Sequence, residues 1–143
     1  MARGRRGARR LVLQALYQHQ LAGHDVAELA AQFSASKEFR GIDAAYFHIL
    51  LGETVPAGAD LDALIAAAAD RPVNQLDPVE RAVLWIGLTE LRAHPDVPGR
   101  VVIDEAVELA KEFGAQDSFR YINAVLDSMS RRLRPGAVPA ADG

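Results

Sequence analysis

The stretch of sequence that decides the fold is LDPVERAVLWIGLTEL, at residues 76–91. It opens with a clear helix-start signal, in which Asp77 suits the cap, Pro78 the first helical position and Glu80 the third. The residues that follow are apolar on nearly every side, namely Val79, Val83, Leu84, Trp85, Ile86, Leu88 and Leu91. A helix without a solvated face is buried, so this segment is predicted to be the central rod around which the others pack.

Outward from this rod, the sequence predicts further helices and no strands. Strict alternation of apolar and polar residues is absent, and Pro or Gly breaks are spaced for helices of two to five turns. The predicted helices lie at about 6–22, 25–41, 43–56, 58–69, 77–91, 100–113 and 117–133. We therefore expect an all-α, single compact domain over 1–135, with about seven helices arranged as two packed three- to four-helix subdomains.

The DRPVNQ connector at 70–75 is the candidate boundary between those subdomains, which would span 1–70 and 71–135. The last residues, 136–143, follow Pro135 and are predicted to form a flexible tail.

Composition narrows the function classes. The chain has 143 residues and no cysteine, which excludes disulfides, thiolate metal sites and a cysteine nucleophile and fits a reducing interior. Its four histidines show no metal-ligand spacing, Asp60-Leu-Asp62 lacks the pattern of a calcium loop, and no Gly-rich phosphate loop precedes a helix. We expect a cytoplasmic protein that is not an enzyme and binds neither metal nor cofactor.

Charge is distributed unevenly. The net charge is −3, yet residues 1–10 hold five arginines and no acid, while the rest holds 11 basic and 19 acidic residues, a balance of −8. A basic segment on an acidic body indicates an anionic partner bound at one place. An organellar transit segment is a competing interpretation, against which stands the absence of serine before Ser34.

On a helical wheel of about 100° per residue, the first helix separates two faces. The outer sector holds a stripe of four residues, Arg6, Arg10, Gln14 and Tyr17, with Arg5 and Arg9 at its border. Positive charge at a helix start and like charges four residues apart are both unfavourable, so a bound anion is expected to compensate. Guanidinium groups bind phosphates bidentately and an exposed tyrosine stacks on a base, whereas the alternative is a solvated basic helix end.

A second exposed aromatic is predicted on the last helix. Tyr121 points about 100° away from the nearest core position of that helix. Because most tyrosines are at least partly buried, this signal is weak alone.

Three segments together resemble the NusB family: RRGARRLVLQALYQ at 5–18, PVERAVLWIGLTEL at 78–91 and EAVELAKEFGAQDSFRYINAVLD at 105–127. The likeness covers the chain to about Pro135. It implies a transcription antitermination factor that binds single-stranded boxA RNA of nascent ribosomal transcripts together with ribosomal protein NusE. Through other Nus factors, that complex would act on the elongating RNA polymerase, with no membrane partner and as a monomer or a homodimer.

The resemblance also implies site residues. Those expected to contact RNA are Arg5, Arg6, Arg9, Arg10, Gln14, Tyr17, Phe113, Asp117 and Tyr121. Asp117 has a plain helix cap as its competing role, and Phe113 the closing of its helix over the core. Glu80 and Arg81, at the expected exposed start of the central helix, resemble the NusE-binding region, with a capping box as the alternative for Glu80.

One departure and two rival classes accompany the resemblance. Gly7 stands where relatives often carry a basic residue, which is expected to loosen the first turn. NusB-like domains also precede ribosomal RNA methyltransferases, but this short, cysteine-free chain has no room for that enzyme's α/β domain and lacks its nucleophile. The other rival is a protein-interaction module whose arginines bind an acidic partner.

Overall fold

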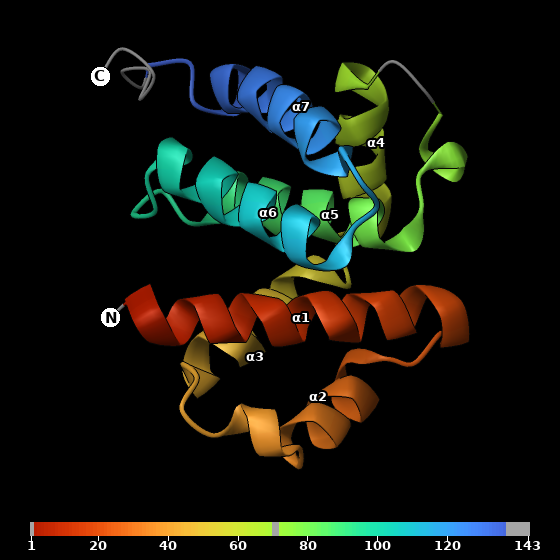
Figure 1. Ribbon diagram of the computed structural model, residues 1–143, viewed down its shortest axis with the longest axis vertical. Helices are drawn as coiled ribbons and strands as arrows, with labels where there is room; N and C mark the ends of the chain where they lie inside the picture. The colour runs from red at the N-terminus through yellow and green to blue at the C-terminus, as the bar shows by residue number, and fades with distance from the viewer. Residues whose placement is uncertain (1, 70–71, 137–143) are drawn as a thin grey trace. The chain divides into compact units, whose positions relative to one another are not determined.

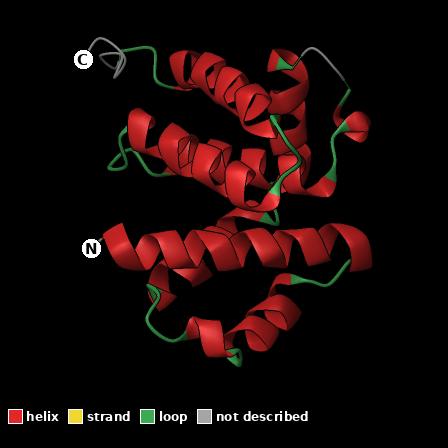
Figure 2. Cartoon of the chain, viewed as in Figure 1, coloured by secondary structure: helices red, strands yellow, loops and turns green. Residues whose placement is uncertain are grey.

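The computed structural model describes the backbone of residues 2–69 and 72–136, and within these ranges it is helical without strands (Figure 2). The α-helices are α1 Ala2–Ala22, α2 Val26–Ser34, α3 Ala44–Thr54, α4 Gly58–Ala68, α5 Pro78–Ala93, α6 Gly99–Phe113 and α7 Ser118–Leu133. Two 3₁₀ turns are η1 Lys37–Phe39 and η2 Val73–Gln75. The prediction of an all-α fold with about seven helices is confirmed, while the predicted tail, residues 136–143, lies outside the described residues except for Gly136.

The chain divides into two compact units, Met1–Gly58 and Ala59–Gly143. The first unit contains α1, α2 and α3, and the second contains nearly all of α4 together with α5, α6 and α7 (Figure 1). The division falls at the start of α4, before the connector at 70–75.

In the first unit, α1 packs on both α2 and α3. Asp25 caps α2 through a reciprocal capping box with Glu28, and the Asp43 carboxylate accepts a bond of 3.0 Å from the Tyr46 backbone N–H at the start of α3. The predicted helix from Asp25 to Gly41 is wrong in its length. It ends at Ser34 because the Ser36 hydroxyl donates to the Phe33 carbonyl at 2.8 Å, which replaces a further helical turn.

In the second unit, α6 and α7 both pack on α5 (Figure 1). Asp77 caps α5 by accepting a 2.8 Å bond from the Glu80 backbone N–H, and every residue from Ala82 to Leu91 is buried. The predicted burial of this helix is therefore confirmed, and within the second unit α6 and α7 pack around it as expected. Val79 is only half-buried, since it lies in the first turn of the helix.

The spacing of apolar residues predicts core positions on the last two helices, at Val102, Leu109 and Ala110 of α6 and at Phe119, Ile122, Leu126, Met129 and Leu133 of α7. Most of these predictions are confirmed. The buried ones are Val102, Leu109, Ala110, Ile122, Leu126 and Met129. Phe119 and Leu133, which were also expected in the core, are half-buried because they lie in the first and last turns of α7.

Arg134 closes the second unit after α7 ends. Its guanidinium donates to four backbone carbonyls at or beyond the end of α5, those of Glu90, Leu91, His94 and Val97, at 2.6 to 3.1 Å. Unpaired carbonyls at a helix end need such donors, so this arginine holds the end of α7 to the end of α5. Among the described residues, no helix combines the length and the apolar character needed to cross a membrane.

Candidate nucleic-acid interface

The outer face of α1 is the stripe that the helical wheel predicted. All four of its residues are exposed, namely Arg6, Arg10, Gln14 and Tyr17, the last with 42% of its surface accessible. The opposite face holds the buried residues Ala8, Leu11, Val12, Ala15 and Leu16. The helix begins at Ala2, before the predicted start, and has no acid in its first turn. The stripe therefore offers two cations, an amide and an aromatic ring along one side of one helix.

Arg5 and Arg9 lie differently from Arg6 and Arg10. Arg9 is only 4% exposed and Arg5 is half-buried. The guanidinium carbon of Arg5 lies 4.2 Å and that of Arg9 lies 5.6 Å from the ring centroid of Tyr46, a residue that is itself 3% exposed. Cations at these distances are attracted to the ring face. The four arginines expected to form one surface thus divide into an outward pair and a pair held against an aromatic ring.

The second candidate segment runs from the end of α6 into α7. Phe113 is the last residue of α6 and is half-buried. Gly114 follows, and a Cβ at this position would lie 2.5 Å from the Ser118 hydroxyl and 2.7 Å from the Ala110 carbonyl oxygen. Only glycine fits this close approach, which turns the chain directly from α6 into α7.

Asp117 occupies the cap position of α7 without capping it. Its backbone is left-handed, with φ 68° and ψ 0°, and its side chain makes no capping hydrogen bond. The carboxylate instead lies 3.5 Å from the Arg120 side-chain nitrogen, and both side chains are exposed. The capping role expected for Asp117 is therefore wrong, because the left-handed backbone differs from the extended conformation of capping residues.

Tyr121 is half-buried, and its hydroxyl oxygen is inaccessible to solvent. The expectation of an exposed ring is wrong, since the wheel considers α7 alone whereas α6 packs closely along it. Phe119, in the first turn of α7, is half-buried, and its ring has two cations near it. Lys111 Nζ is 5.0 Å and the Arg120 guanidinium carbon 5.2 Å from its centroid.

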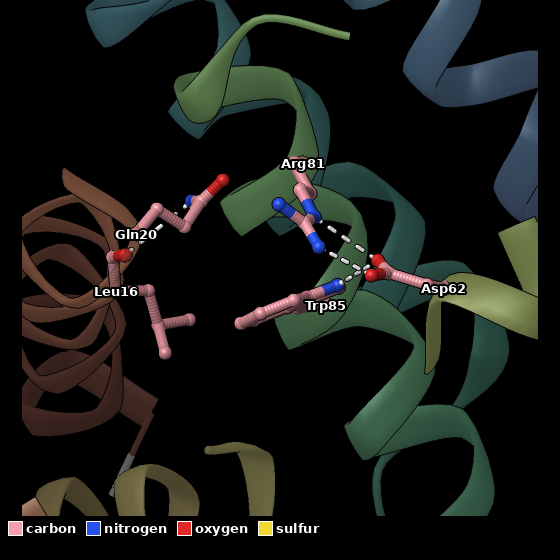
Figure 3. A network of polar contacts seen from close by, with 5 residues as sticks. All are labelled: Leu16, Gln20, Asp62, Arg81 and Trp85. Atoms are coloured by element: carbon pink, nitrogen blue, oxygen red, sulfur yellow. Dashed lines mark hydrogen bonds and ion pairs between the residues drawn. The ribbon is translucent and has the colours of Figure 1, made fainter. Parts of the chain in front are cut away.

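The start of α5 is less exposed than the sequence indicated. Glu80 is only 7% exposed, and the Arg81 side chain is 31% exposed. Arg81 Nε donates to Asp62 Oδ1 at 3.0 Å, a second guanidinium nitrogen contacts Asp62 Oδ2, and Trp85 Nε1 donates to Asp62 Oδ1 at 2.9 Å (Figure 3). The Arg81 guanidinium also lies 4.9 Å from the Trp85 ring centroid. This partly exposed network joins α4 to α5 within the second unit.

Known proteins share both the sequence pattern and the helical fold of this chain. Residues 6–131 match the model of the NusB family. The chain belongs to the NusB family. The transcription antitermination protein NusB of Alcanivorax borkumensis is 51% identical over 130 residues, covering 91% of this chain and 87% of that one. The NusB protein of Baumannia cicadellinicola is 47% identical over 131 residues, covering 92% and 94% of the two chains.

A solved structure of the family is also similar. In a crystal structure of the antitermination factors NusB and NusE in complex with double-stranded RNA, one chain is 28% identical to this one, with a TM-score of 0.80. The match covers 92% of this chain and 99% of that chain. The resemblance predicted from three separate segments is thereby confirmed.

The candidate residues of this NusB-family chain are divided between its units. Arg5, Arg6, Arg9, Arg10, Gln14 and Tyr17 belong to the first unit, whereas Glu80, Arg81, Phe113, Asp117 and Tyr121 belong to the second. In the described part of the chain, no three His, Asp or Glu side chains are grouped so as to hold a metal ion.

Sequence reasoning missed the side chains that hold the candidate residues in place. Tyr46 stands in the sequence as one of an apolar cluster with Phe47, Leu50 and Leu51, which predicts a core position and nothing more. Asp62 was considered only in the rejected calcium pattern. Each acts on an arginine far away in the sequence, and nothing in the local pattern around it signals that contact. Phe119 was assigned to the core for its spacing, although Lys111 eight residues earlier is a cation that a loop can bring beside it.

Proposed function

We propose that this NusB-family chain is a transcription antitermination factor that binds the boxA element of nascent ribosomal RNA together with ribosomal protein NusE. The observation that carries the proposal is the exposed stripe of Arg6, Arg10, Gln14 and Tyr17 on α1. Family membership and the NusB–NusE–RNA complex of a structural relative support it.

The stripe has the chemistry that a nucleic-acid strand requires. Guanidinium forks bind phosphate oxygens bidentately, so Arg6 and Arg10 would hold the backbone. The Gln14 amide both donates and accepts hydrogen bonds and would contact a base edge. The accessible ring of Tyr17 would stack on an unpaired base, which favours a single strand over a duplex.

A second RNA contact is proposed at Phe113, Asp117 and Tyr121. The exposed Asp117 carboxylate has the geometry to accept hydrogen bonds from a base amine, because it is not engaged in capping α7. Phe113 and Tyr121 each keep part of their surface accessible, so a base would contact them at an edge. Lys111 and Arg120, which both lie near the Phe119 ring, would add phosphate contacts beside them.

For NusE we propose the start of α5, at Glu80 and Arg81. Glu80 is buried and Asp62 already binds Arg81, so contact with NusE would involve the exposed third of the Arg81 side chain. The role is one of binding, without catalysis, and its place would be the cytoplasm, where transcripts emerge from RNA polymerase.

The deciding experiment titrates the protein with a labelled boxA RNA, with a scrambled RNA of the same length, and with boxA annealed to its complement. Each titration is run with and without NusE. We expect the single-stranded boxA RNA to bind most tightly, and NusE to increase its affinity further.

Equal affinity for boxA and scrambled RNA would refute sequence-specific binding. Tighter binding to the duplex would refute the single-stranded mode. If the protein binds none of these RNAs but does bind an acidic protein, the alternative of a protein-interaction module would be favoured.

A further inference from the structure

The arginine-rich end of α1 is fixed to the segment before α3 by a backbone hydrogen bond and by close packing at two glycines. The Gly4 carbonyl accepts a 2.9 Å bond from the Asp43 backbone N–H, and a Cβ at Gly4 would lie 3.0 Å from that same nitrogen. A Cβ at Gly7 would lie 2.6 Å from Ile42 Cγ2. Both glycines thus allow the helix to lie directly on the segment before α3. The sequence predicted that Gly7 loosens the first turn, whereas its close contact with Ile42 holds this part of the helix in place.

Tyr46 lies one turn into α3 from this contact. Its backbone N–H is held by the Asp43 carboxylate at 3.0 Å, and its ring is buried. The ring is therefore fixed in place before any ligand arrives, and it meets Arg5 at 4.2 Å and Arg9 at 5.6 Å. These two arginines are one turn apart and repel each other, and an aromatic face that attracts both offsets this repulsion.

The consequence concerns the direction of the other two arginines. Each of Arg6 and Arg10 follows an inward arginine by one residue, which is about 100° of rotation around the helix. Once Arg5 and Arg9 are held on the Tyr46 ring, rotation of α1 about its own axis is restricted. Arg6 and Arg10 then point outward together. Arg9, 4% exposed, lies too deep to meet a strand on the surface.

We propose that Tyr46 is a positioning residue for RNA binding, which holds Arg5 and Arg9 as an inner layer and so fixes the outward direction of Arg6 and Arg10. Arg9 itself neutralises no phosphate. This inference rests on the proposed RNA-binding function. It gives Arg5 and Arg9 a different role from Arg6 and Arg10, although the sequence predicted RNA contact for all four.

The first test compares Arg9→Met with the matched variant Arg6→Met, in boxA titrations over a range of salt concentrations. Loss of one phosphate contact reduces the slope of log K against log salt by about 0.7 for a single strand. We expect that reduction for Arg6→Met. For Arg9→Met we expect binding to weaken by the same factor at every salt concentration, so that the slope stays equal to that of the unaltered protein. An equal reduction of the slope in both variants would overturn the proposal.

The second test needs no RNA. Amide hydrogen exchange of α1 residues 6–12 is compared among the unaltered protein, Tyr46→Phe and Tyr46→Leu. The phenylalanine variant keeps the ring face and should exchange like the unaltered protein, whereas the leucine variant should exchange about tenfold faster. If Tyr46→Leu does not fold, Arg9→Met takes its place with the same expectation. Unchanged exchange in a folded variant would overturn the proposal.

The two tests separate this inference from the proposed function. If the unaltered protein binds boxA and scrambled RNA equally, the proposed function fails, and the exchange experiment still decides whether Tyr46 holds α1. If boxA binding is specific but the exchange is unchanged, only the role of Tyr46 fails.

Discussion

Asp117 combines a left-handed backbone with an exposed carboxylate that does not cap its helix. A left-handed conformation costs an ordinary L-residue roughly 1–2 kcal/mol, and Asp and Asn tolerate it best. A residue kept in such a conformation, with a side chain that does not cap its helix, is a candidate for function.

The change Asp117→Asn separates binding from stability at this site. Asparagine tolerates the same backbone, and the exposed ion pair with Arg120 contributes little, so the free energy of unfolding should change by less than about 0.5 kcal/mol. Binding to boxA RNA should weaken by about 1 kcal/mol, because the hydrogen bond to a base amine loses its charge. Asp104→Asn, an exposed acid of α6, is the control and should leave RNA binding unchanged. A loss of stability without loss of binding would show that Asp117 is structural.

Arg134 shows how much one side chain beyond a helix end can stabilise. Its guanidinium satisfies four carbonyls, and the planar fork can do so where a lysine ammonium cannot. We expect Arg134→Ala to lower the free energy of unfolding by about 2–3 kcal/mol in urea denaturation, because four partly buried charge-assisted hydrogen bonds are lost. Arg134→Lys should recover less than half of the loss. Arg131→Ala, an exposed neighbour paired with Asp127, should cost little.

How far the sequence predicts these residues depends on the range of their contacts. The wheel predicted the exposed stripe on α1, because the position of a residue on one helix depends only on local periodicity. The wheel placed Arg9 at the border of that stripe, whereas Arg9 is buried and lies 5.6 Å from the ring centroid of Tyr46, 37 positions further along the chain. The half-burial of Tyr121 and the Arg81–Asp62 pair depend likewise on neighbouring helices.

At the scale of elements, capping signals predicted helix starts better than polar stretches predicted helix ends. The sequence predicts that Asp25 and Asp77 cap their helices, and both do, since a side-chain bond to a nearby amide is a local event. Asp43, after which a helix was expected to start, also caps it. The end of α2 was predicted too late because the Ser36 hydroxyl competes with the backbone there. Asp117 was predicted to cap α7 and does not, because the tight turn after Gly114 gives it a left-handed backbone.

Substitutions of two exposed residues of α1, Tyr17 and Leu21, are predicted to reduce the affinity for RNA by different amounts. Tyr17→Ala should weaken boxA binding by about 1–3 kcal/mol with little change in the salt slope, because it removes stacking and no charge. Leu21→Ala, one turn further along, is the matched control, since Leu21 is also exposed and apolar but has no ring to stack on a base. Equal losses in the two variants would indicate a general apolar contact in place of base stacking.

The network between α4 and α5 is the corresponding structural feature of the second unit. Asp62→Ala leaves the Arg81 guanidinium and the Trp85 indole N–H without their shared acceptor. We expect a loss of about 1–3 kcal/mol in the free energy of unfolding, measured by denaturation. Asp60→Ala, an exposed acid in the first turn of the same helix, should change it by only a few tenths of a kcal/mol. A similar loss in both variants would show that the network contributes nothing of its own.

At the scale of the whole molecule, charge confines where a polyanion can bind. Outside the first ten residues the balance is −8, so most of the surface repels RNA at low salt. The outward arginines of α1 and the cations beside Phe119 are local exceptions, and they lie in different units. A strand that binds this chain is therefore expected to have two separate sets of contacts.

That expectation is tested by shortening boxA RNA stepwise from either end. If each unit binds its own part of the strand, removal of nucleotides from one end should abolish the effect of Tyr17→Ala on affinity while Asp117→Asn still weakens binding. Removal from the other end should do the reverse. The losses from the two substitutions should add on the full-length RNA, because distant sites act independently. If both sensitivities disappear at the same step, the strand has one set of contacts, and the residues of one unit are not part of the interface.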